Sequence, residues 1–434
     1  MSLTCILVLL DGLGDRSYPQ LGEKTPLQFA STPNLDHLAG LGANGMLNAI
    51  RPGLSLPSEN AHFALFGYDQ QEFPGRGYLE GAGADIGLGR EDVALLAHFA
   101  SVKQQENVLN LIKHRPKVSP DDAVMLAKLV ARYKNGAIEA TFHPTHGLDG
   151  IVRLQGAVSP YITDSDPLEL NMPLMDVQPW DIARDDFLAA ETALALRQYL
   201  LNSYTTLQSH SFNEERMAKG ELPVNAVITQ RAGQWKEVQS FADRWGLQAG
   251  SIASGLMYWG LASFLGMDAF KVKDSADPGN DLAERLALAK ELSGKCDFIH
   301  VHTKAPDAAA HSKDPHNKVK AIESLDRGLG LMMDRLVDGK TVLVVTADHS
   351  TPSSGPLVHS GEPVPITVVG PGIRRDAVSL FDEVSCAGGA LGHLVGKDFM
   401  YLVLNWLDRA KLQGLMDTPK NQPYWPGKRV PLLV

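Results

Sequence analysis

The chain has 434 residues, a formal net charge of −10, 44% hydrophobic residues and 21% charged residues. This is ordinary globular composition, and the length allows a large α/β core with an insertion. The negative charge argues against a non-specific nucleic-acid partner, but it is compatible with an anionic substrate, because bound divalent cations can invert the local field. Three scattered cysteines, Cys5, Cys296 and Cys386, exclude a disulfide framework and favour a cytoplasmic protein.

The chain begins with the apolar run TCILVLLDG. It is short, lacks a basic flank and ends in Asp11, so we expect a buried first strand and no signal peptide. No stretch of the sequence is long enough to predict a membrane span, and we expect no membrane partner.

Four short apolar runs predict fully buried parallel strands: Cys5 to Leu10, Asp297 to His302, Thr341 to Ala347 and Pro365 to Gly370. A long helical pattern, KVKAIESLDRGLGLMMDRLV, separates the second run from the third. This order predicts a doubly wound, mostly parallel α/β sheet. Asp11, Asp348 and His349 follow two of these strands directly, at the edge where open α/β sheets bind ligands.

The middle of the chain has a different pattern, with alternating segments punctuated by Gly and Pro. Residues 150–156 and 224–230 predict strands, and residues 186–204 predict a long amphipathic helix. We therefore expect residues 1–72 and 236–434 to form the catalytic core, and residues 73–235 to form an inserted α+β domain.

Two motifs offer pairs of metal ligands. In APDAAAH, helical spacing would place Asp307 and His311 on one face, and carboxylate plus imidazole suits Zn²⁺, Mn²⁺ or a similar ion. A solvated helix face would give the same pattern. In TADHST, Asp348 and His349 would point to opposite sides of an extended chain and could serve two ions if the chain turns there. A helix N-cap followed by a surface His is the alternative.

Three further residues become candidates for the site because they accompany these two motifs. His359 lies in a loop before the fourth strand, and Asp11 is followed by glycines that let the backbone approach a ligand. Ser58 precedes an expected helix, where it would be an N-cap, a nucleophile or both, because a helix N-terminus favours an alkoxide and a bound phosphate. Other chemistries fit less well, because the chain has no G-x-S-x-G elbow and no C-x-x-C pair.

In this order, Asp11, Ser58, Asp307/His311, Asp348/His349 and His359 resemble the metal site of the alkaline phosphatase superfamily. More closely, the sequence resembles the archaeal-type, cofactor-independent phosphoglycerate mutases over nearly its whole length. The segments that carry this resemblance are KTPLQFASTPNLDHLA, HFALFGYD, PGRGYLEGAGADIGL, TDSDP, NAVITQRAGQ, ADHSTP, HSGEPVPI and CAGGALGHLVGKDFM.

The resemblance implies an alkaline phosphatase-like core, a small phosphorylated substrate and two divalent ions, typically Mn²⁺, with Mg²⁺, Co²⁺ or Zn²⁺ in some members. One ion would be held by Asp307, His311 and His359, and the other by Asp11, Ser58, Asp348 and His349. Ser58 would take the phosphoryl group from 3-phosphoglycerate and return it to give 2-phosphoglycerate, while the inserted domain closes over the trapped glycerate.

The resemblance also implies basic substrate-binding residues in the insert, and Arg76 and Arg231 lie where members carry them. Arg153, His143 and His146 are the candidates to compensate for basic residues that this chain lacks. The chain departs from the family at Leu148 and Asp149, where members usually carry an aromatic residue or His followed by Arg, and at Leu168, where they often carry His. These departures leave open a related phosphatase or phosphomutase acting on another phosphate ester or a phosphonate. A metal-binding pseudoenzyme fits less well, because every expected ligand is present. The sequence does not indicate the oligomeric state.

Overall fold

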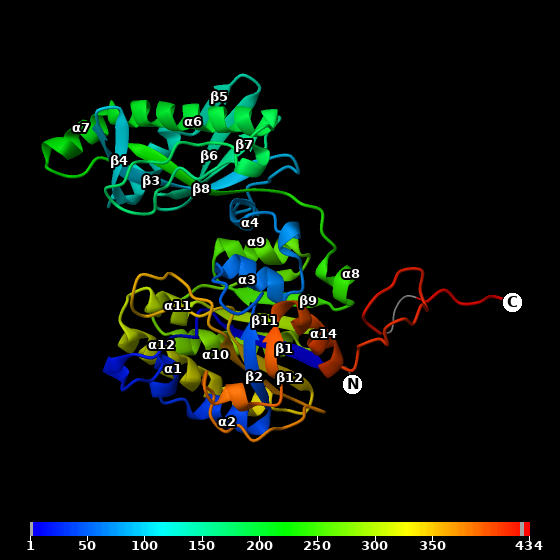
Figure 1. The fold of residues 1–434 in the computed structure, drawn as a ribbon. Helices are drawn as coiled ribbons and strands as arrows, with labels where there is room; N and C mark the ends of the chain where they lie inside the picture. Colours follow the sequence, from blue (N-terminus) through cyan, green and yellow to red (C-terminus); the bar gives the residue numbers. More distant parts are fainter. Residues whose placement is uncertain (1–2, 426–428) are drawn as a thin grey trace. The chain divides into compact units, whose positions relative to one another are not determined.

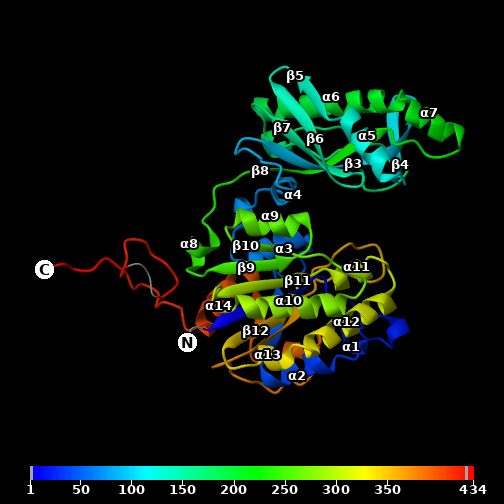
Figure 2. The same ribbon diagram turned by 180° about the vertical axis from the view of Figure 1, so that it is seen from behind.

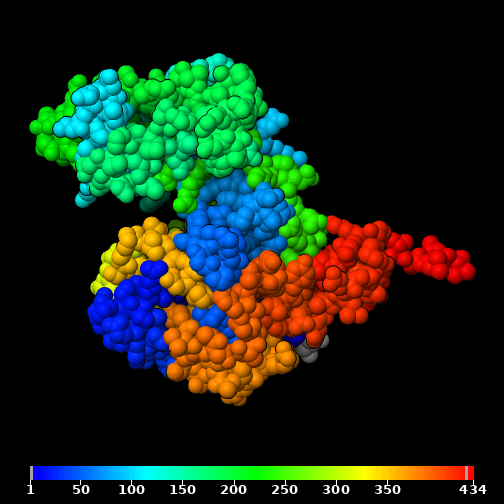
Figure 3. Space-filling view, in the orientation of Figure 1, coloured from blue at the N-terminus to red at the C-terminus, as the bar shows by residue number. Residues whose placement is uncertain are grey.

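A computed structural model describes residues 3–425 and 429–434. The chain forms two compact units, one of Met1–Phe73 with Val238–Val434 and one of Pro74–Glu237. Figures 1 and 2 show the two units from opposite sides. The first unit is discontinuous in sequence, and Figure 3 shows its N-terminal (blue) and later (yellow to orange) segments on one surface. Within the described residues, no helix has the length and apolar character needed to cross a bilayer.

The first unit is built on an eight-stranded sheet with the order β10-β9-β11-β1-β12-β13-β2-β14. Its centre is β1 (Thr4–Leu10), which pairs in parallel with β11 (Phe298–Thr303) and β12 (Thr341–Thr346). Every residue of these three strands is buried, as their continuous apolar runs predict. The remaining strands are β9 (Ala249–Ala253), β10 (Asp268–Lys271), β2 (Ala43–Asn48), β13 (Val364–Val369) and β14 (Gly392–Val395).

Helices cover both faces of this sheet, which confirms the doubly wound α/β class (Figures 1 and 2). On one face α10 (Pro278–Leu292) packs against α12 (Pro315–Gly330). On the other, α3 (Ser58–Leu65) packs against α9 (Leu256–Phe264) and α14 (Gly396–Trp406). The helical pattern before β12 forms α12 followed by the short α13 (Met333–Leu336). Shorter helices are α1 (Pro26–Phe29), α2 (Pro33–Leu41), α8 (Phe241–Trp245) and α11 (Ala305–Ala310).

One strand runs in the direction opposite to the one expected. The apolar run Pro365 to Gly370 lies in β13, which is buried but pairs antiparallel with both β12 and β2. A parallel strand needs a crossover connection, usually a helix. Residues 347–363 between β12 and β13 contain no helix, so the chain returns from the edge at which β12 ends. The prediction of a parallel strand was wrong here, and the reversal matters for the site.

The second unit is an antiparallel sheet packed against helices. Its strands follow the order β4-β3-β7-β6-β5, and β8 pairs with β3. The expected strands lie in β7 (Asp149–Gln155) and β8 (Ala226–Gln234), and the expected helix lies in α6 (Phe187–Gln208). The other elements are β3 (Val93–Gln105), β4 (Val108–His114), β5 (Arg132–Asn135), β6 (Ile138–His146), α4 (Arg76–Gly83), α5 (Pro120–Leu129) and α7 (Ser211–Ala218). This unit has a hydrophobic core of its own, to which β3, β7 and α6 contribute.

Candidate metal centre

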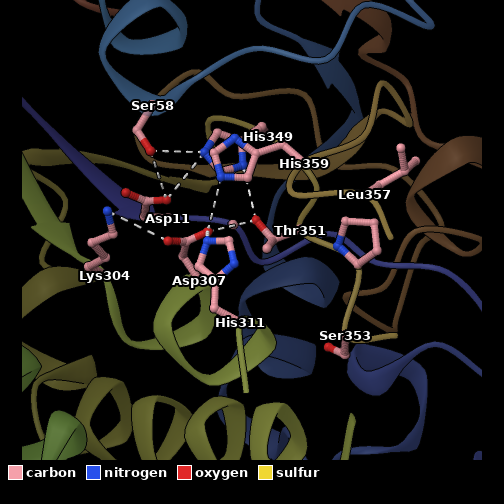
Figure 4. Close-up of polar contacts among 12 residues, drawn as sticks. Asp11, Ser58, Lys304, Asp307, His311, His349, Thr351, Ser353, Leu357 and His359 are labelled. Atoms are coloured by element: carbon pink, nitrogen blue, oxygen red, sulfur yellow. Dashed lines mark hydrogen bonds and ion pairs between the residues drawn. The ribbon is translucent and has the colours of Figure 1, made fainter. Parts of the chain in front are cut away.

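The candidate site lies at one edge of the eight-stranded sheet, where neighbouring strands end. The register pairs Leu10 with Thr303 and Leu9 with Thr346, so the carboxyl ends of β1, β11 and β12 meet there. Asp11 and Lys304 follow β1 and β11 directly, and Asp348 lies two residues after the end of β12. Because β13 runs antiparallel to β12, the loop before β13 returns to the same edge and brings His359 with it. Figure 4 shows the converging side chains.

Asp307, His311 and His359 form a first group of candidate metal ligands. Asp307 Oδ1 lies 3.2 Å from His311 Nε2 and 3.4 Å from His359 Nε2. Asp307 and His311 meet because one turn of helix separates them, as their spacing predicts. Burial would raise the pKa of Asp307, but hydrogen bonds from the two histidines outweigh burial and hold that pKa well below its usual range. Asp307 is therefore an anion in the folded protein.

Asp11, Ser58, Asp348 and His349 form a second group. Ser58 Oγ lies 3.0 Å from His349 Nε2 and 3.5 Å from Asp11 Oδ1. His349 Nε2 lies 3.4 Å from Asp11 Oδ1 and 3.2 Å from Asp348 Oδ2. The chain bends at Asp348, so Asp348 and His349 converge although they are adjacent in sequence. Ser58 is the first residue of α3, and the N-cap position belongs to Pro57.

The two groups form one continuous site. The rings of His349 and His359 stack with centroids 3.8 Å apart and an interplanar angle of 20°. Thr351 Oγ1 lies 2.9 Å from Asp307 Oδ1 and 3.2 Å from His349 Nδ1, which links the groups through one hydroxyl (Figure 4). Because the Thr351 hydroxyl donates to Asp307, His349 Nδ1 must donate to Thr351. The lone pair of His349 Nε2 then faces Ser58 and the carboxylates.

The donor set fits divalent cations. His359 Nδ1 donates to the Leu56 carbonyl oxygen at 2.7 Å, which leaves Nε2, on the side of Asp307, as the nitrogen that a cation would take. The buried oxygens Asp307 Oδ2 and Asp348 Oδ2 accept no hydrogen bond, although Lys304 Nζ lies 3.6 Å from the former. Buried carboxylate oxygens normally have partners. Carboxylates, imidazoles and a hydroxyl that turn lone pairs toward one another are the surroundings that a cation such as Zn²⁺ or Mn²⁺ requires.

Three neighbouring residues, which the motif analysis did not identify, hold these ligands in place. Tyr258 donates to Asp11 Oδ2 at 2.5 Å, and His302 Nε2 lies 3.0 Å from the same oxygen. His62 Nδ1 lies 2.8 Å from the Ser58 carbonyl oxygen. Burial would raise the pKa of Asp11, but the hydrogen bond from His302 helps to hold that pKa below its usual range. A histidine at the end of an apolar strand could have signalled His302, whereas nothing in the sequence around Tyr258 marks it.

Gly12 shows how closely the backbone is packed beneath the site. Its φ is +67°, and a Cβ at this position would lie 2.5 Å from Thr351 Oγ1 and 2.8 Å from Asp307 Cβ. Its amide donates to Asp348 Oδ1 at 3.1 Å. The glycine after Asp11 therefore provides both the turn and the space that two ligand-bearing segments need.

The arginines expected to bind substrate lie in the second unit. Arg76 Nε donates to Glu80 Oε1 at 2.7 Å, and Arg153 Nε donates to Asp92 Oδ2 at 2.8 Å. Arg231 lies on β8, at a φ of +53°. The backbones at the start of α4 and at Arg231 are adjacent, because a Cβ at Gly77 would lie 2.8 Å from the Arg231 carbonyl oxygen. Their roles toward a substrate stay predictions.

Asp149, which departs from the family pattern, is not a free negative charge. Its Oδ1 lies 2.6 Å from Arg115 Nη2, and Arg115 Nε donates to the same oxygen at 2.7 Å. This pair neutralises the carboxylate that would otherwise repel a phosphate.

Comparison with known proteins identifies the family. Residues 3–406 match the metalloenzyme superfamily. The chain is 41% identical over 431 residues to 2,3-bisphosphoglycerate-independent phosphoglycerate mutase 2 of Methanocaldococcus jannaschii, covering 98% of both chains. It is 36% identical to the corresponding mutase of Methanopyrus kandleri, covering 94% of this chain and 98% of that one.

Solved structures support the same family assignment. The cofactor-independent phosphoglycerate mutase of Thermoplasma acidophilum matches with a TM-score of 0.64 and 28% identity, covering 93% of this chain and 99% of that one. A protein from Pyrococcus horikoshii matches with a TM-score of 0.79 and 26% identity, covering 96% and 100%. With its buried carboxylates and histidines at the sheet edge, the chain belongs to the metalloenzyme superfamily and, within it, to the 2,3-bisphosphoglycerate-independent phosphoglycerate mutase family.

Proposed function

We propose that this protein interconverts 3-phosphoglycerate and 2-phosphoglycerate by transferring the phosphoryl group to Ser58 and back. The observation that carries this proposal is the position of the Ser58 hydroxyl, 3.0 Å from His349 Nε2 at the edge of a site built from three buried carboxylates. The curated relatives that match over nearly the whole chain are named for this activity.

The surroundings of Ser58 favour a nucleophilic oxygen. Ser58 is buried and begins α3, so its oxygen lies at the positive end of the helix dipole. The Ser58 hydroxyl donates to Asp11 Oδ1 at 3.5 Å, and His349 Nε2 lies 3.0 Å from the same hydroxyl oxygen. His62 holds the Ser58 carbonyl oxygen and thereby the backbone that carries the nucleophile. The hydroxyl is thus positioned for attack on a phosphorus atom.

Two divalent ions would complete the site. Asp307, His311 and His359 would hold one, and Asp11, Ser58, Asp348 and His349 would hold the other, with Mn²⁺ as the expected ion and Mg²⁺, Co²⁺ or Zn²⁺ as alternatives. When bound, such ions lower the pKa of a coordinated hydroxyl and neutralise charge on the transferring phosphoryl group. Thr351 fixes the relative positions of Asp307 and His349 and therefore of the two ligand groups.

The proposed reaction is two successive transfers. In the first, the Ser58 oxygen bonds to phosphorus, and the bond to the substrate's 3-oxygen breaks, leaving phosphoserine and glycerate. In the second, the 2-oxygen of the same glycerate takes the phosphoryl group and Ser58 is regenerated. Water would intercept the phosphoserine, so glycerate must stay bound between the steps. We assign this retention to the inserted unit, with Arg76, Arg153 and Arg231 as the candidate contacts to the substrate's anionic groups.

The test is to follow 3-phosphoglycerate with the Mn²⁺-loaded protein by ³¹P NMR in ¹⁸O-labelled water. We expect 2-phosphoglycerate without ¹⁸O and little free phosphate, because the phosphoryl group never meets water. Labelled phosphate as the main product would show that the protein is a phosphatase. No reaction would refute the assigned substrate.

Ser58→Ala isolates the nucleophile. We expect this variant to lose turnover by several orders of magnitude, because it lacks the hydroxyl that takes the phosphoryl group, while the melting temperature stays close to that of the native protein. Ser55→Ala is the matched control, since Ser55 is exposed and lies three residues earlier, in the loop before α3. Isomerisation by Ser58→Ala at a rate near that of Ser55→Ala would rule out the phosphoserine mechanism.

A further inference from the structure

The second unit contains a cluster of potential metal ligands that are neither in the two ligand groups of the first unit nor among the candidate substrate contacts Arg76, Arg153 and Arg231. His98 lies on β3, His114 ends β4, and Asp166 lies in the loop that follows β7. His98 Nε2 lies 2.9 Å from His114 Nδ1, and each of these nitrogens lies 3.8 Å from Asp166 Oδ2. One nitrogen from each imidazole and one carboxylate oxygen thus converge on a single point.

These distances match the spacing of ligands around a tetrahedral ion. Ligand atoms about 2.1 Å from a tetrahedral zinc ion lie roughly 3.4 Å from one another. The three distances in the cluster, 2.9, 3.8 and 3.8 Å, lie on either side of that value. An ion therefore fits between the three atoms after side-chain shifts of a few tenths of an ångström.

The surrounding contacts orient the ligands as they do in metal sites. His114 Nε2 lies 3.4 Å from the Leu168 carbonyl oxygen, so its proton belongs on Nε2, and the Nδ1 lone pair faces His98. The Leu168 amide donates to Asp166 Oδ1 at 2.8 Å, and Gln230 Nε2 donates to Asp166 Oδ2. The Leu168 backbone, which contacts both His114 and Asp166, has a φ of +65°, a conformation that a leucine rarely adopts. Strained backbone of this kind concentrates at functional sites.

The cluster is buried on one side and reachable from solvent on the other. The side chains of His98 and Asp166 are 5% and 0% exposed. The His114 side chain is 26% exposed, which leaves a path from solvent and room for a further ligand.

We propose that His98, His114 and Asp166 bind a divalent transition-metal ion of the Zn²⁺ class, in a site separate from the metal centre of the first unit. Two imidazoles and one carboxylate are a ligand set suited to Zn²⁺, and a fourth position remains for water or an anionic group. Every contact described for this site lies within the second unit.

The test compares metal content in full-length proteins. Each protein is stripped with a chelator, reloaded with Zn²⁺, desalted and analysed by elemental mass spectrometry. We expect His98→Gln/His114→Gln to bind one equivalent less than the native protein, and Asp166→Asn to bind that equivalent more weakly. His146→Gln is the matched control, because His146 is an exposed histidine of the same unit outside the cluster. Equal zinc content in the double variant and the control would overturn the proposal.

A measurement on the native protein avoids any folding defect of the variants. Diethyl pyrocarbonate modifies accessible, neutral histidines, and peptide mapping reports each one. We expect Zn²⁺ to protect His114 at least tenfold while His146 is modified at an unchanged rate. Modification of His114 at the same rate with and without Zn²⁺ would contradict the site. Neither measurement requires turnover, so failure of this proposal is distinguishable from failure of the proposed function.

Discussion

Replacing Tyr258 by Phe tests whether the contacts behind the metal ligands set metal affinity. Tyr258 donates to Asp11 Oδ2 at 2.5 Å, and its side chain is buried. Burial and the charge of Asp11 raise the pKa of Tyr258 far above its usual value, so the hydroxyl remains a donor at every working pH. Tyr258→Phe removes this donor without changing the shape of the ring, and it leaves His302 as the neighbour that still donates to the same oxygen.

The expected effect can be estimated from the lost contact. A hydrogen bond to a charged group contributes about 1.5–3 kcal/mol, and loss of a contact that orients a metal ligand weakens metal binding by about 10- to 100-fold. We therefore expect the Kd for Mn²⁺ to rise by about that factor, while kcat at saturating Mn²⁺ falls much less. Isothermal titration of the metal-free protein measures the Kd, and activity at high Mn²⁺ gives the second quantity.

Tyr18→Phe is the matched control. Tyr18 is also buried and donates to a buried carboxylate, Asp15 Oδ1, at 2.6 Å, but Asp15 belongs to an ion pair with Lys318 outside the two ligand groups. Both variants should lose stability by a similar amount, whereas Tyr258→Phe alone should lose affinity for Mn²⁺. The reasoning would be refuted if Tyr258→Phe bound Mn²⁺ as tightly as the native protein, or if Tyr18→Phe weakened binding equally.

Three further variants test other parts of the first unit. Lys318→Met leaves the buried Asp15 carboxylate without its cation. We therefore expect the free energy of unfolding, measured by chemical denaturation, to fall by about 3–5 kcal/mol, and a fall of less than about 1 kcal/mol would contradict this. Burial raises the pKa of Glu383 from 4.5 to about 7, so between these values the folded state holds an extra proton and stability falls as pH rises. The melting temperature of Glu383→Gln, relative to that of the native protein, should therefore rise between about pH 5 and about pH 8. A difference in melting temperature that stays constant over this range would refute the raised pKa of Glu383. Gly12→Ala places a Cβ against Thr351 at a positive φ, and we expect lower thermal stability and weaker Mn²⁺ binding, where unchanged values would show that the loop can shift.

The sequence predicted those parts of the site that follow from local pattern. Continuous apolar runs identified β1, β11 and β12, and the strand-end rule placed Asp11 and Asp348 at one edge. Helical spacing placed Asp307 beside His311. The position of His359 depended on a property that the run Pro365 to Gly370 does not encode, namely the antiparallel direction of β13. A fully buried strand has the same apolar pattern in either direction, so only the missing crossover helix could have indicated the reversal.

Residues that act through other residues were harder to predict. Tyr258 reaches Asp11 from a helix about 250 positions later in the chain, and its neighbours give no sign of that contact. The cluster of His98, His114 and Asp166 joins two strands and a loop without any recognisable spacing. In both cases the contact depends on how distant elements pack. The roles of Arg76, Arg153 and Arg231 stay predictions for the same reason, because a substrate contact is not a property of the local sequence.

The most direct test of the central claim is to look for the phosphoryl group on Ser58. The Mn²⁺-loaded protein is mixed with 3-phosphoglycerate, quenched in acid within milliseconds and digested, and the peptide that contains Ser58 is examined by mass spectrometry. We expect phosphate on Ser58 at early times and none in Ser58→Ala, with its formation at least as fast as the appearance of 2-phosphoglycerate. Formation of 2-phosphoglycerate while the Ser58 peptide stays unmodified would contradict the account.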